Sequence, residues 1–249
     1  MIVFQAFARK NAQQEQNERL FTAIKKEDFA GIRQLLGSGA SVKAVGGDKS
    51  TIFHFLNGRF DAETADLIFK KLSQECNDDK AEMARVLNAR DGFGMSALMN
   101  ACNSKTEPGG HTFLTQNDKN KIHIIGLMLE NGSDARAIGN EHMSVLSYAL
   151  PMRATTIKSL GISKKNEPLR LDYSHVSAGI ADLVIFDMLL KAGANPEGAT
   201  TYGFKSLKAE INAMISDYEN MRKEIGGALG PGDRALIKEI KGLMKKSAQ

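Results

Sequence analysis

The sequence contains no tryptophan, and aromatic residues make up only 6% of its 249 positions. A hydrophobic core built from this chain should therefore be mainly aliphatic. No apolar run approaches the roughly 20 residues that a membrane-spanning helix needs, so we expect no stable membrane span. The apolar segment Ile2–Phe7 is followed by Arg9 and Lys10, whereas a secretory signal carries its positive charge first. We expect residues 1–18 to form an N-terminal capping helix instead.

Cysteine is also scarce, with only Cys76 and Cys102 present. Two distant cysteines cannot make a disulfide framework or a close zinc or redox pair, so a reducing compartment fits the composition best. None of the five histidines has metal-ligand spacing to another histidine or to a cysteine. We therefore expect no metal site and no cofactor, and we expect both thiols to be small buried or half-buried side chains.

The chain lacks the dense basic stripe with aromatic partners that a phosphate backbone normally requires. Its 33 basic and 29 acidic residues leave a net charge of +4. Residues 151–178 and 231–249 each contain five basic and two acidic residues, so these two segments together carry +6 and the remainder carries −2. We therefore expect no nucleic-acid partner.

The clearest sequence motif occupies residues 87–101. It contains Asp91-Gly92-Phe93-Gly94, in which the aspartate can bond to its own backbone and glycine tolerates positive φ, so the spacing predicts a tight turn. Ser96 follows at the position of a helix cap, and Leu98 and Ala101 give the next helix an apolar face. The motif therefore predicts a turn that leads directly into a helix.

This motif recurs in weaker forms along the chain, which indicates an internal repeat. The weaker copies are Thr51–Leu56, Ser144–Ala149, a shortened copy at Leu20–Ala23 and a degraded copy at Gly203–Leu207. Three copies are followed, after a variable gap, by a second amphipathic helix that ends near Gly39, Gly132 or Gly193. Glycine in the left-handed conformation is the expected stop at the C-terminus of a helix.

These units resemble ankyrin repeats, in which a β-turn finger is followed by two antiparallel helices in about 33 residues. The similarity is greatest at Asn88–Ala101 and at Leu189–Asn195. The resemblance covers roughly residues 19–210 and implies an all-α, ankyrin-like solenoid of about four to five divergent repeats with β-turn fingers. It also implies a structural hydrogen-bonding role for His54, which occupies a helix position where the family commonly has histidine.

The spacing between copies exceeds one repeat at three places, which predicts insertions at residues 73–86, 103–120 and 151–179. Loops of this size are uncommon in compact domains and often carry function. The last two insertions would project from the end of the solenoid opposite the fingers. We expect either a second contact surface there, with Lys164, Lys165 and Arg170 as its basic part, or variable loops without a dedicated role.

Residues 206–249 have the pattern of two further helices. Apolar residues recur at helical spacing over residues 206–225 and again over 234–246, with a glycine-rich break between them. Because the ends of a solenoid expose apolar surface, we expect C-terminal capping helices here. A basic amphipathic helix that contacts a membrane or a partner protein is the alternative.

The sequence shows no catalytic constellation, so we expect a protein that is not an enzyme. Residues 198–206 resemble a phosphate-binding loop, but Phe204 displaces the lysine and no strand pattern precedes the loop. Cys102 and His111 lie in one loop region, but a Cys–His nucleophile also needs an orienting group that the sequence does not show. The alternative is an enzyme, or a regulatory subunit of one, with a pocket formed by the insertions.

The resemblance places a partner protein on the finger tips and on exposed helix positions of a concave surface. Exposed aromatic side chains at these positions would be the main anchors. The residues of this chain at those positions are Asp48, Ser50, Phe93, Met95, Asn103, Glu141, Met143, Tyr202 and Phe204. We therefore expect a protein–protein interaction module, an adaptor or scaffold, for which a monomer is sufficient.

The location of the protein has two interpretations. The composition fits the cytoplasm, where thiols stay reduced. Divergent bacterial ankyrin proteins are also commonly delivered into host cells by a bacterial secretion system, and the irregular repeats and long insertions of this chain fit that class as well. No delivery signal is evident in the sequence.

Overall fold

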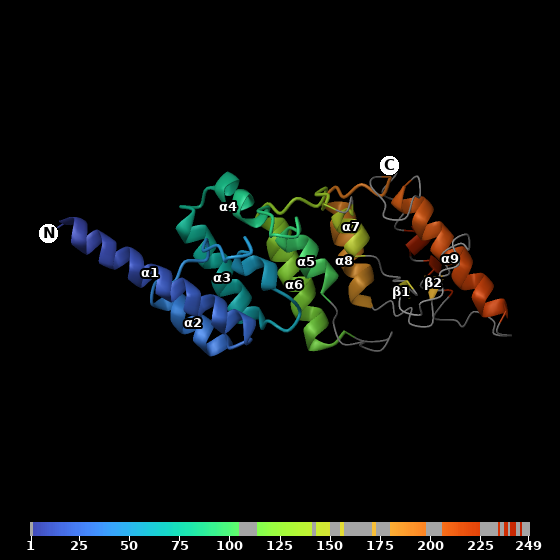
Figure 1. Cartoon of the computed structure of the whole chain (residues 1–249). Helices are drawn as coiled ribbons and strands as arrows, with labels where there is room; N and C mark the ends of the chain where they lie inside the picture. Colours follow the sequence, from blue (N-terminus) through green and yellow to red (C-terminus); the bar gives the residue numbers. More distant parts are fainter. Residues whose placement is uncertain are drawn as a thin grey trace, which may run out of the picture.

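The computed structural model of the chain is mostly helical (Figure 1). It describes residues 2–104, 114–140, 143–149, 155–156, 171–172, 180–197, 206–224, 234, 237, 238, 240–242 and 245. The helices succeed one another along the molecule in the order of the sequence, from α1 (Ile2–Lys25) at one end to α9 (Leu207–Glu224) near the other (Figure 1). The prediction of a mainly helical chain is therefore confirmed.

Eight of the helices are arranged in two layers. The first layer contains α1, the 3₁₀-helix η1 (Ile52–Phe55), α5 (Ala97–Asn103) and α7 (Val145–Tyr148), each in contact with the next. The second layer contains α2 (Phe29–Gly37), α3 (Ala62–Glu75), α6 (Gln116–Glu130) and α8 (Ile180–Lys191), again each in contact with the next. Contacts of α1 with α2, α5 with α6 and α7 with α8 join the layers. Sequence neighbours therefore pack across the layers, and successive pairs pack side by side.

All three predicted insertions contain secondary structure, and helix α6 (Gln116–Glu130) begins inside the one predicted at residues 103–120. Helix α4 (Lys80–Leu87) lies at the end of the insertion predicted at residues 73–86, whose first residues instead extend α3. Strand β1 (Thr155–Thr156) pairs antiparallel with β2 (Leu171–Asp172) inside the insertion at residues 151–179. The other residues of that insertion, including Lys164, Lys165 and Arg170, lie outside the described residues, as do residues 105–113.

The core lies between the two layers and is mainly aliphatic, as the composition predicts. The largest fully buried side chains are nevertheless aromatic, and they are Phe53, Phe60 and Phe186. Phe53 meets Phe69 edge to face with ring centroids 5.5 Å apart, an arrangement worth about 0.5–1.5 kcal/mol beyond the burial of area. Phenylalanine therefore provides the largest side chains in a core that has no tryptophan.

Helix α1 is continuous and has no break at residue 18. The predicted N-terminal capping helix and the shortened first copy of the motif are therefore parts of one helix. Asn17 anchors its middle, because the N–H of Ser41, in the loop after α2, donates to Asn17 Oδ1 at 3.0 Å. The buried side chains of Leu20 and Ile24 then join the C-terminal half of α1 to the core.

Helices α2, α6 and α8 end in the same way. Gly39, Gly132 and Gly193 follow them with φ values of 106°, 96° and 90°, in the left-handed region that glycine adopts without steric cost. In each case the N–H of the residue after the glycine donates at 2.9 Å to the carbonyl near the end of the helix, which satisfies a group the helix leaves open. The predicted glycine stops are confirmed.

The carbonyls of the same three glycines also accept hydrogen bonds from side chains of an earlier segment. These bonds run from Gln13 to Gly39 (2.8 Å), from Asn88 to Gly132 (2.9 Å) and from Arg136 to Gly193 (3.1 Å). The C-terminal ends of α2, α6 and α8 are thereby fixed to segments that precede them in the sequence.

We expect Gly132→Ala to destabilise the protein, because Gly132 has positive φ and a Cβ there would lie 2.8 Å from the Cβ of Ala84 in α4. The expected loss in the free energy of unfolding, measured by urea denaturation, is about 1–3 kcal/mol. Gly37→Ala is the matched control, since a Cβ on Gly37 at the end of α2 meets no atom within 4 Å. Equal losses for both variants would contradict the helix end described here.

Candidate partner-binding surface

Three loops lead into helices of the first layer, and one isolated β-bridge closes each of them. The bridges join Val45 to Thr51, Arg90 to Ser96 and Ile138 to Ser144. We call residues 45–51, 90–96 and 138–144 the three bridged loops, of which residues 141 and 142 lie outside the described part of the chain. Because the bridged residues have the same sequence separation in each loop, the loops correspond position by position.

The second bridged loop is a tight turn organised by Asp91. Its Oδ1 atom accepts hydrogen bonds from the N–H groups of Phe93 and Met95, both at 2.9 Å. The N–H of Gly94 donates to the carbonyl of Asp91 at 3.0 Å, and Gly94 has a φ of +77°. The predicted aspartate–glycine turn is confirmed, and it fixes the backbone on both sides of Phe93.

The last residue of each bridged loop begins the helix that follows. The side chain of Ser96 accepts a hydrogen bond from the N–H of Met99 at the start of α5, and that of Ser144 accepts one from the N–H of Ser147 in α7. Serine at this position satisfies a backbone donor that the helix cannot. The turn therefore leads directly into the helix, as the sequence motif predicts.

His54 ties the first bridged loop to the second. Its Nδ1 atom accepts a hydrogen bond from the N–H of Thr51 at 3.0 Å, so the neutral ring carries its proton on Nε2. Nε2 lies 3.2 Å from the carbonyl oxygen of Met95 and donates to it. The predicted structural role of His54 is confirmed.

Backbone and side-chain hydrogen bonds also link the loops to one another in a row. The N–H of Gly92 in the second loop donates to the carbonyl of Asp48 in the first at 2.7 Å. The third loop is linked to the second in a similar way, because Asn140 Nδ2 donates to the carbonyl of Phe93 at 3.2 Å. Asn140 occupies the position of Gly92 in its loop, and Phe93 occupies that of Asp48. The N–H of Gly47, at the same position in the first loop, has no acceptor among the described residues. The row is therefore open at its first loop.

Asp48 accepts the link from Gly92 through its backbone carbonyl, and its side chain is exposed. Its Oδ1 atom accepts a hydrogen bond from the N–H of Ser50 at 3.1 Å, and this bond lowers the pKa of the carboxyl below its usual value. The carboxylate is therefore ionised and is held at the tip of the first bridged loop.

Among the side chains whose burial the structure describes, a set that leaves out residues 2–10 and part of α9, the large exposed apolar ones all lie on the three bridged loops. Phe93 is 79% exposed, Val45 is 63% exposed and Ile138 is 49% exposed. Val45 and Ile138 occupy the same first position of their loops, and Arg90 occupies that position in the loop between them. Exposed apolar side chains grouped on neighbouring rigid loops are typical of a surface that another molecule covers.

A groove with a volume of about 900 Å³ lies beside the first bridged loop. Its lining includes Phe21 and Lys25 of α1 on one side and residues 44–48 on the other. Phe21 meets Phe55 edge to face at 6.2 Å between centroids, and Lys25 Nζ lies 5.8 Å from the centre of the same ring. The groove therefore has Phe21 and polar side chains of α1 on one side and the exposed Val45, at the open end of the row, on the other.

The structure separates the predicted partner-binding residues into accessible, half-buried and buried ones. Asp48, Phe93 and Asn103 are exposed, whereas Met95 and Met143 are half-buried against the core. Ser50 is only 4% exposed, so its prediction as a contact residue is wrong, because its side chain turns inward at the base of the first bridged loop. The remaining predicted residues, Glu141, Tyr202 and Phe204, lie outside the described residues.

Sequence reasoning missed Val45, Ile138 and the groove beside α1. The available signal was positional, because both apolar residues immediately precede a glycine at the start of a bridged loop. Their exposure depends on the direction in which the bridge points the side chain. The groove depends on packing between residues far apart in the sequence, which the local motif does not determine.

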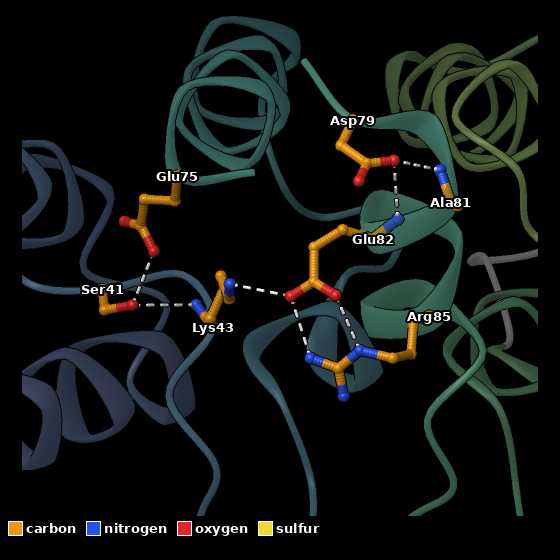
Figure 2. A network of polar contacts seen from close by, with 7 residues as sticks. All are labelled: Ser41, Lys43, Glu75, Asp79, Ala81, Glu82 and Arg85. Atoms are coloured by element: carbon orange, nitrogen blue, oxygen red, sulfur yellow. Dashed lines mark hydrogen bonds and ion pairs between the residues drawn. The ribbon is translucent and has the colours of Figure 1, made fainter. Parts of the chain in front are cut away.

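A cluster of charged residues joins α4 to the rest of the chain (Figure 2). Glu82 accepts hydrogen bonds from Lys43 Nζ at 2.8 Å and from Arg85 Nε and Nη2 at 2.7 and 2.8 Å. Beside it, Ser41 Oγ donates to Glu75 at 2.6 Å (Figure 2). These bonds connect the loop after α2 with both α3 and α4.

The electrostatics of this cluster fit a structural role. The bonds from Arg85 and Lys43 lower the pKa of Glu82 to about 2, and the bond to Glu82 raises the pKa of Lys43 and that of Arg85. Glu82, Lys43 and Arg85 are thus held in their ordinary charged forms at neutral pH, whereas a general acid or base needs a pKa nearer the working pH. The cluster anchors the inserted helix α4.

Both thiols of the chain lie in the hydrophobic core. Cys76 and Cys102 are buried, as predicted, and burial raises the pKa of the Cys76 thiol. Within the described part of the chain no three His, Cys, Asp or Glu side chains are grouped as metal ligands would be. The helices described here include none that is long and apolar enough to cross a membrane.

A scan of the sequence against models of known protein families finds no match, and a search of curated proteins finds none either. The function proposed below is therefore argued from the geometry of the three bridged loops.

We expect Glu82→Gln to destabilise the protein at neutral pH but not in strong acid. The pKa of Glu82 in the folded protein, about 2, lies below its ordinary value of 4.5. The stabilisation from the ionised carboxylate is therefore fully present above about pH 4.5 and is lost as the pH falls toward about 2. The difference in the free energy of unfolding between wild type and variant, measured with urea at several pH values, should shrink over this window.

Glu130→Gln is the control for this experiment, because Glu130 is exposed and has no ion pair among the described residues. It should change the stability little at any pH. A difference between wild type and Glu82→Gln that stays constant from about pH 6 to about pH 2 would contradict the role assigned to the ionised carboxylate.

Proposed function

We propose that the chain is an ankyrin-type repeat stack that binds another protein through the three bridged loops and the groove beside α1. Three features support the assignment to this class. The helices pair across two layers, a bridged loop leads into each of three first-layer helices, and a left-handed glycine ends each of three second-layer helices. The recurrence of all three features in one order is typical of a stacked repeat.

The exposure of Phe93 carries the functional proposal. A phenylalanine that is 79% exposed leaves a large apolar surface in water, and burial of a Phe side chain contributes about 1.5–3 kcal/mol. Its backbone is fixed by Asp91 and by the link to Asn140. Binding of a partner at Phe93 would therefore cost little backbone conformational entropy. Aromatic side chains on rigid supports are the usual anchors of protein interfaces.

Val45 and Ile138 extend this anchor into a surface. They lie on the loops on either side of the second bridged loop, and they are the other two large apolar side chains exposed among those whose burial the structure describes. Arg90 lies between them and has no carboxylate partner among the described residues. A partner segment with apolar side chains on both sides of a carboxylate would complement this row. The inserted loops at residues 103–120 and 151–179 would add contacts outside it.

Site-specific photo-crosslinking in the cell that makes the protein tests this proposal. A photo-crosslinking residue in place of Val45 or Ile138 should give one discrete protein adduct. The same residue in place of Lys70, which is exposed on α3 in the second layer, should give none and is the matched control. Phe93→Ala should lower the adduct yield from position 45 by at least about tenfold at limiting partner concentration, because loss of an anchor costs about 2 kcal/mol or more.

The helical content of Phe93→Ala should equal that of wild type by circular dichroism, since the side chain is exposed and its backbone bonds remain. If position 70 gave the same adduct as position 45, or if Phe93→Ala left the yield unchanged, the binding surface would lie elsewhere in the protein.

A further inference from the structure

The first bridged loop has no other loop ahead of it in the row. The second and third loops are each bonded to the loop before them, through Gly92 and Asn140. Ahead of the first loop the chain is the continuous helix α1 (Ile2–Lys25), and Gly47, at the position of Gly92, lines the groove beside this helix. The groove therefore lies where the other loops have a preceding loop.

Gly92 and Gly47 show how a loop with a predecessor differs from a loop without one. A Cβ on Gly92 would lie 3.1 Å from the carbonyl oxygen of Asp48, whereas a Cβ on Gly47 would meet no atom within 4 Å. The N–H of Gly92 donates to that carbonyl at 2.7 Å, and the N–H of Gly47 has no acceptor among the residues that the structure describes. The space and the donor that the second loop uses for its neighbour are thus both open at the first loop.

The α1 side of the groove offers polar groups that match a peptide main chain. Gln14 is exposed and its Nε2 donates to Glu18 at 3.3 Å, but its Oε1 accepts no hydrogen bond within the described part of the chain. Asn17 accepts from the N–H of Ser41 through Oδ1, and its Nδ2 has no acceptor in the same part. Together with the N–H of Gly47, the groove presents two donors and one acceptor. A peptide main chain carries both kinds of group at nearly every residue.

Two apolar side chains also border the groove. Val45 is 63% exposed, and Phe21 of α1 is half-buried and meets Phe55 edge to face. The ring of Phe21 comes within 3.6 Å of the place that a Cβ on Gly46 would take, so it reaches the first bridged loop itself. An apolar side chain of a bound segment that packs against Val45 and Phe21 would remove apolar surface from water.

A small molecule or a helix fits this groove less well than an extended segment. Small-molecule sites bury most of the ligand, whereas Gln14, Glu18 and Thr22 on the α1 side of this groove are all exposed. A helix pairs its carbonyls with its own N–H groups, so it has few to offer to Gly47. An extended segment keeps its carbonyls and N–H groups free for the groove.

We propose that the groove beside α1 binds an extended segment of a partner protein, which continues the row of loops. One main-chain carbonyl of the segment accepts a hydrogen bond from the N–H of Gly47, as the carbonyl of Asp48 accepts one from Gly92. One apolar side chain of the segment packs against Val45 and Phe21. In segment addition of this kind, main-chain bonds give affinity and side-chain contacts give specificity. This inference rests on the proposed function, because the segment belongs to the partner that the bridged loops hold.

Two substitutions at Gly47 separate the effect of its N–H from that of its side chain. Gly47→Pro removes the donor. Proline suits this position, because the N–H of Lys49 donates to the carbonyl of Gly46 at 3.0 Å and so makes Gly47 the second residue of a four-residue turn. Gly47→Ala keeps the donor and adds a Cβ where no atom lies within 4 Å.

Photo-crosslinking with the full chain, in the cell that makes it, tests the proposal. A photo-crosslinking residue in place of Gln14 should give an adduct with the same partner as one in place of Ile138, and mass spectrometry should map it to one short continuous stretch of that partner. The same residue in place of Arg19, which is exposed on α1 but outside the groove, should give none. At limiting partner concentration, the yield from position 14 should be at least about fivefold lower with Gly47→Pro than with Gly47→Ala, because only proline leaves the partner's carbonyl without its donor.

A synthetic peptide of the mapped stretch gives a second measurement, on the wild-type protein. Added in excess, it should slow the amide hydrogen exchange of Gly47, measured by NMR, at least about tenfold. This measurement decides the matter alone if Gly47→Pro fails to fold by circular dichroism.

Three results would overturn this inference and leave the proposed function standing. They are an adduct from position 138 without one from position 14, equal yields for Gly47→Pro and Gly47→Ala, and an exchange rate of Gly47 that the peptide does not change. An adduct from position 14 with a second copy of this chain would overturn it as well. The absence of adducts from both positions 14 and 138 would contradict the proposed function itself.

Discussion

The hydrogen bond from the N–H of Gly92 to the carbonyl of Asp48, at 2.7 Å, is the contact on which the candidate surface depends. It joins two loops that lie far apart in the sequence, and it does so through backbone atoms. Asn140 repeats the link on the next loop with its side chain. Because neighbouring loops are held in this way, Val45, Phe93 and Ile138 are presented together and not on separate flexible turns.

Contacts between neighbouring segments also fix the C-terminal ends of α2, α6 and α8. A single pair of short helices cannot bury enough apolar surface to be stable alone. Here the carbonyls of Gly39, Gly132 and Gly193 are each bound by a side chain from an earlier segment. The inserted helix α4 is attached through Glu82 and also packs its Ala84 close to Gly132. Contacts between adjacent units thus contribute much of the stability, and the same contacts hold the bridged loops in place.

The features that the sequence could predict are those determined within a few residues. The turn at Asp91, the cap at Ser96 and the three glycine stops depend on local backbone geometry, and the structure contains all of them. The burial of Ser50 and the exposure of Val45 could not be predicted, because each depends on how a loop lies against helices from other units. The sequence also places an insertion at residues 73–86 without predicting that helix α4 fills its end, since that helix is stabilised by Lys43, far away in the chain.

Amide hydrogen exchange measured by NMR tests the row of loops most directly. Gly92 and Gly47 occupy the same position in successive loops, but only the N–H of Gly92 has an acceptor among the described residues. The N–H of Gly92 should therefore exchange at least about a hundredfold more slowly than that of Gly47, relative to their rates in unstructured peptides. Equal protection at the two glycines, or faster exchange at Gly92, would contradict the linked row on which the binding surface rests.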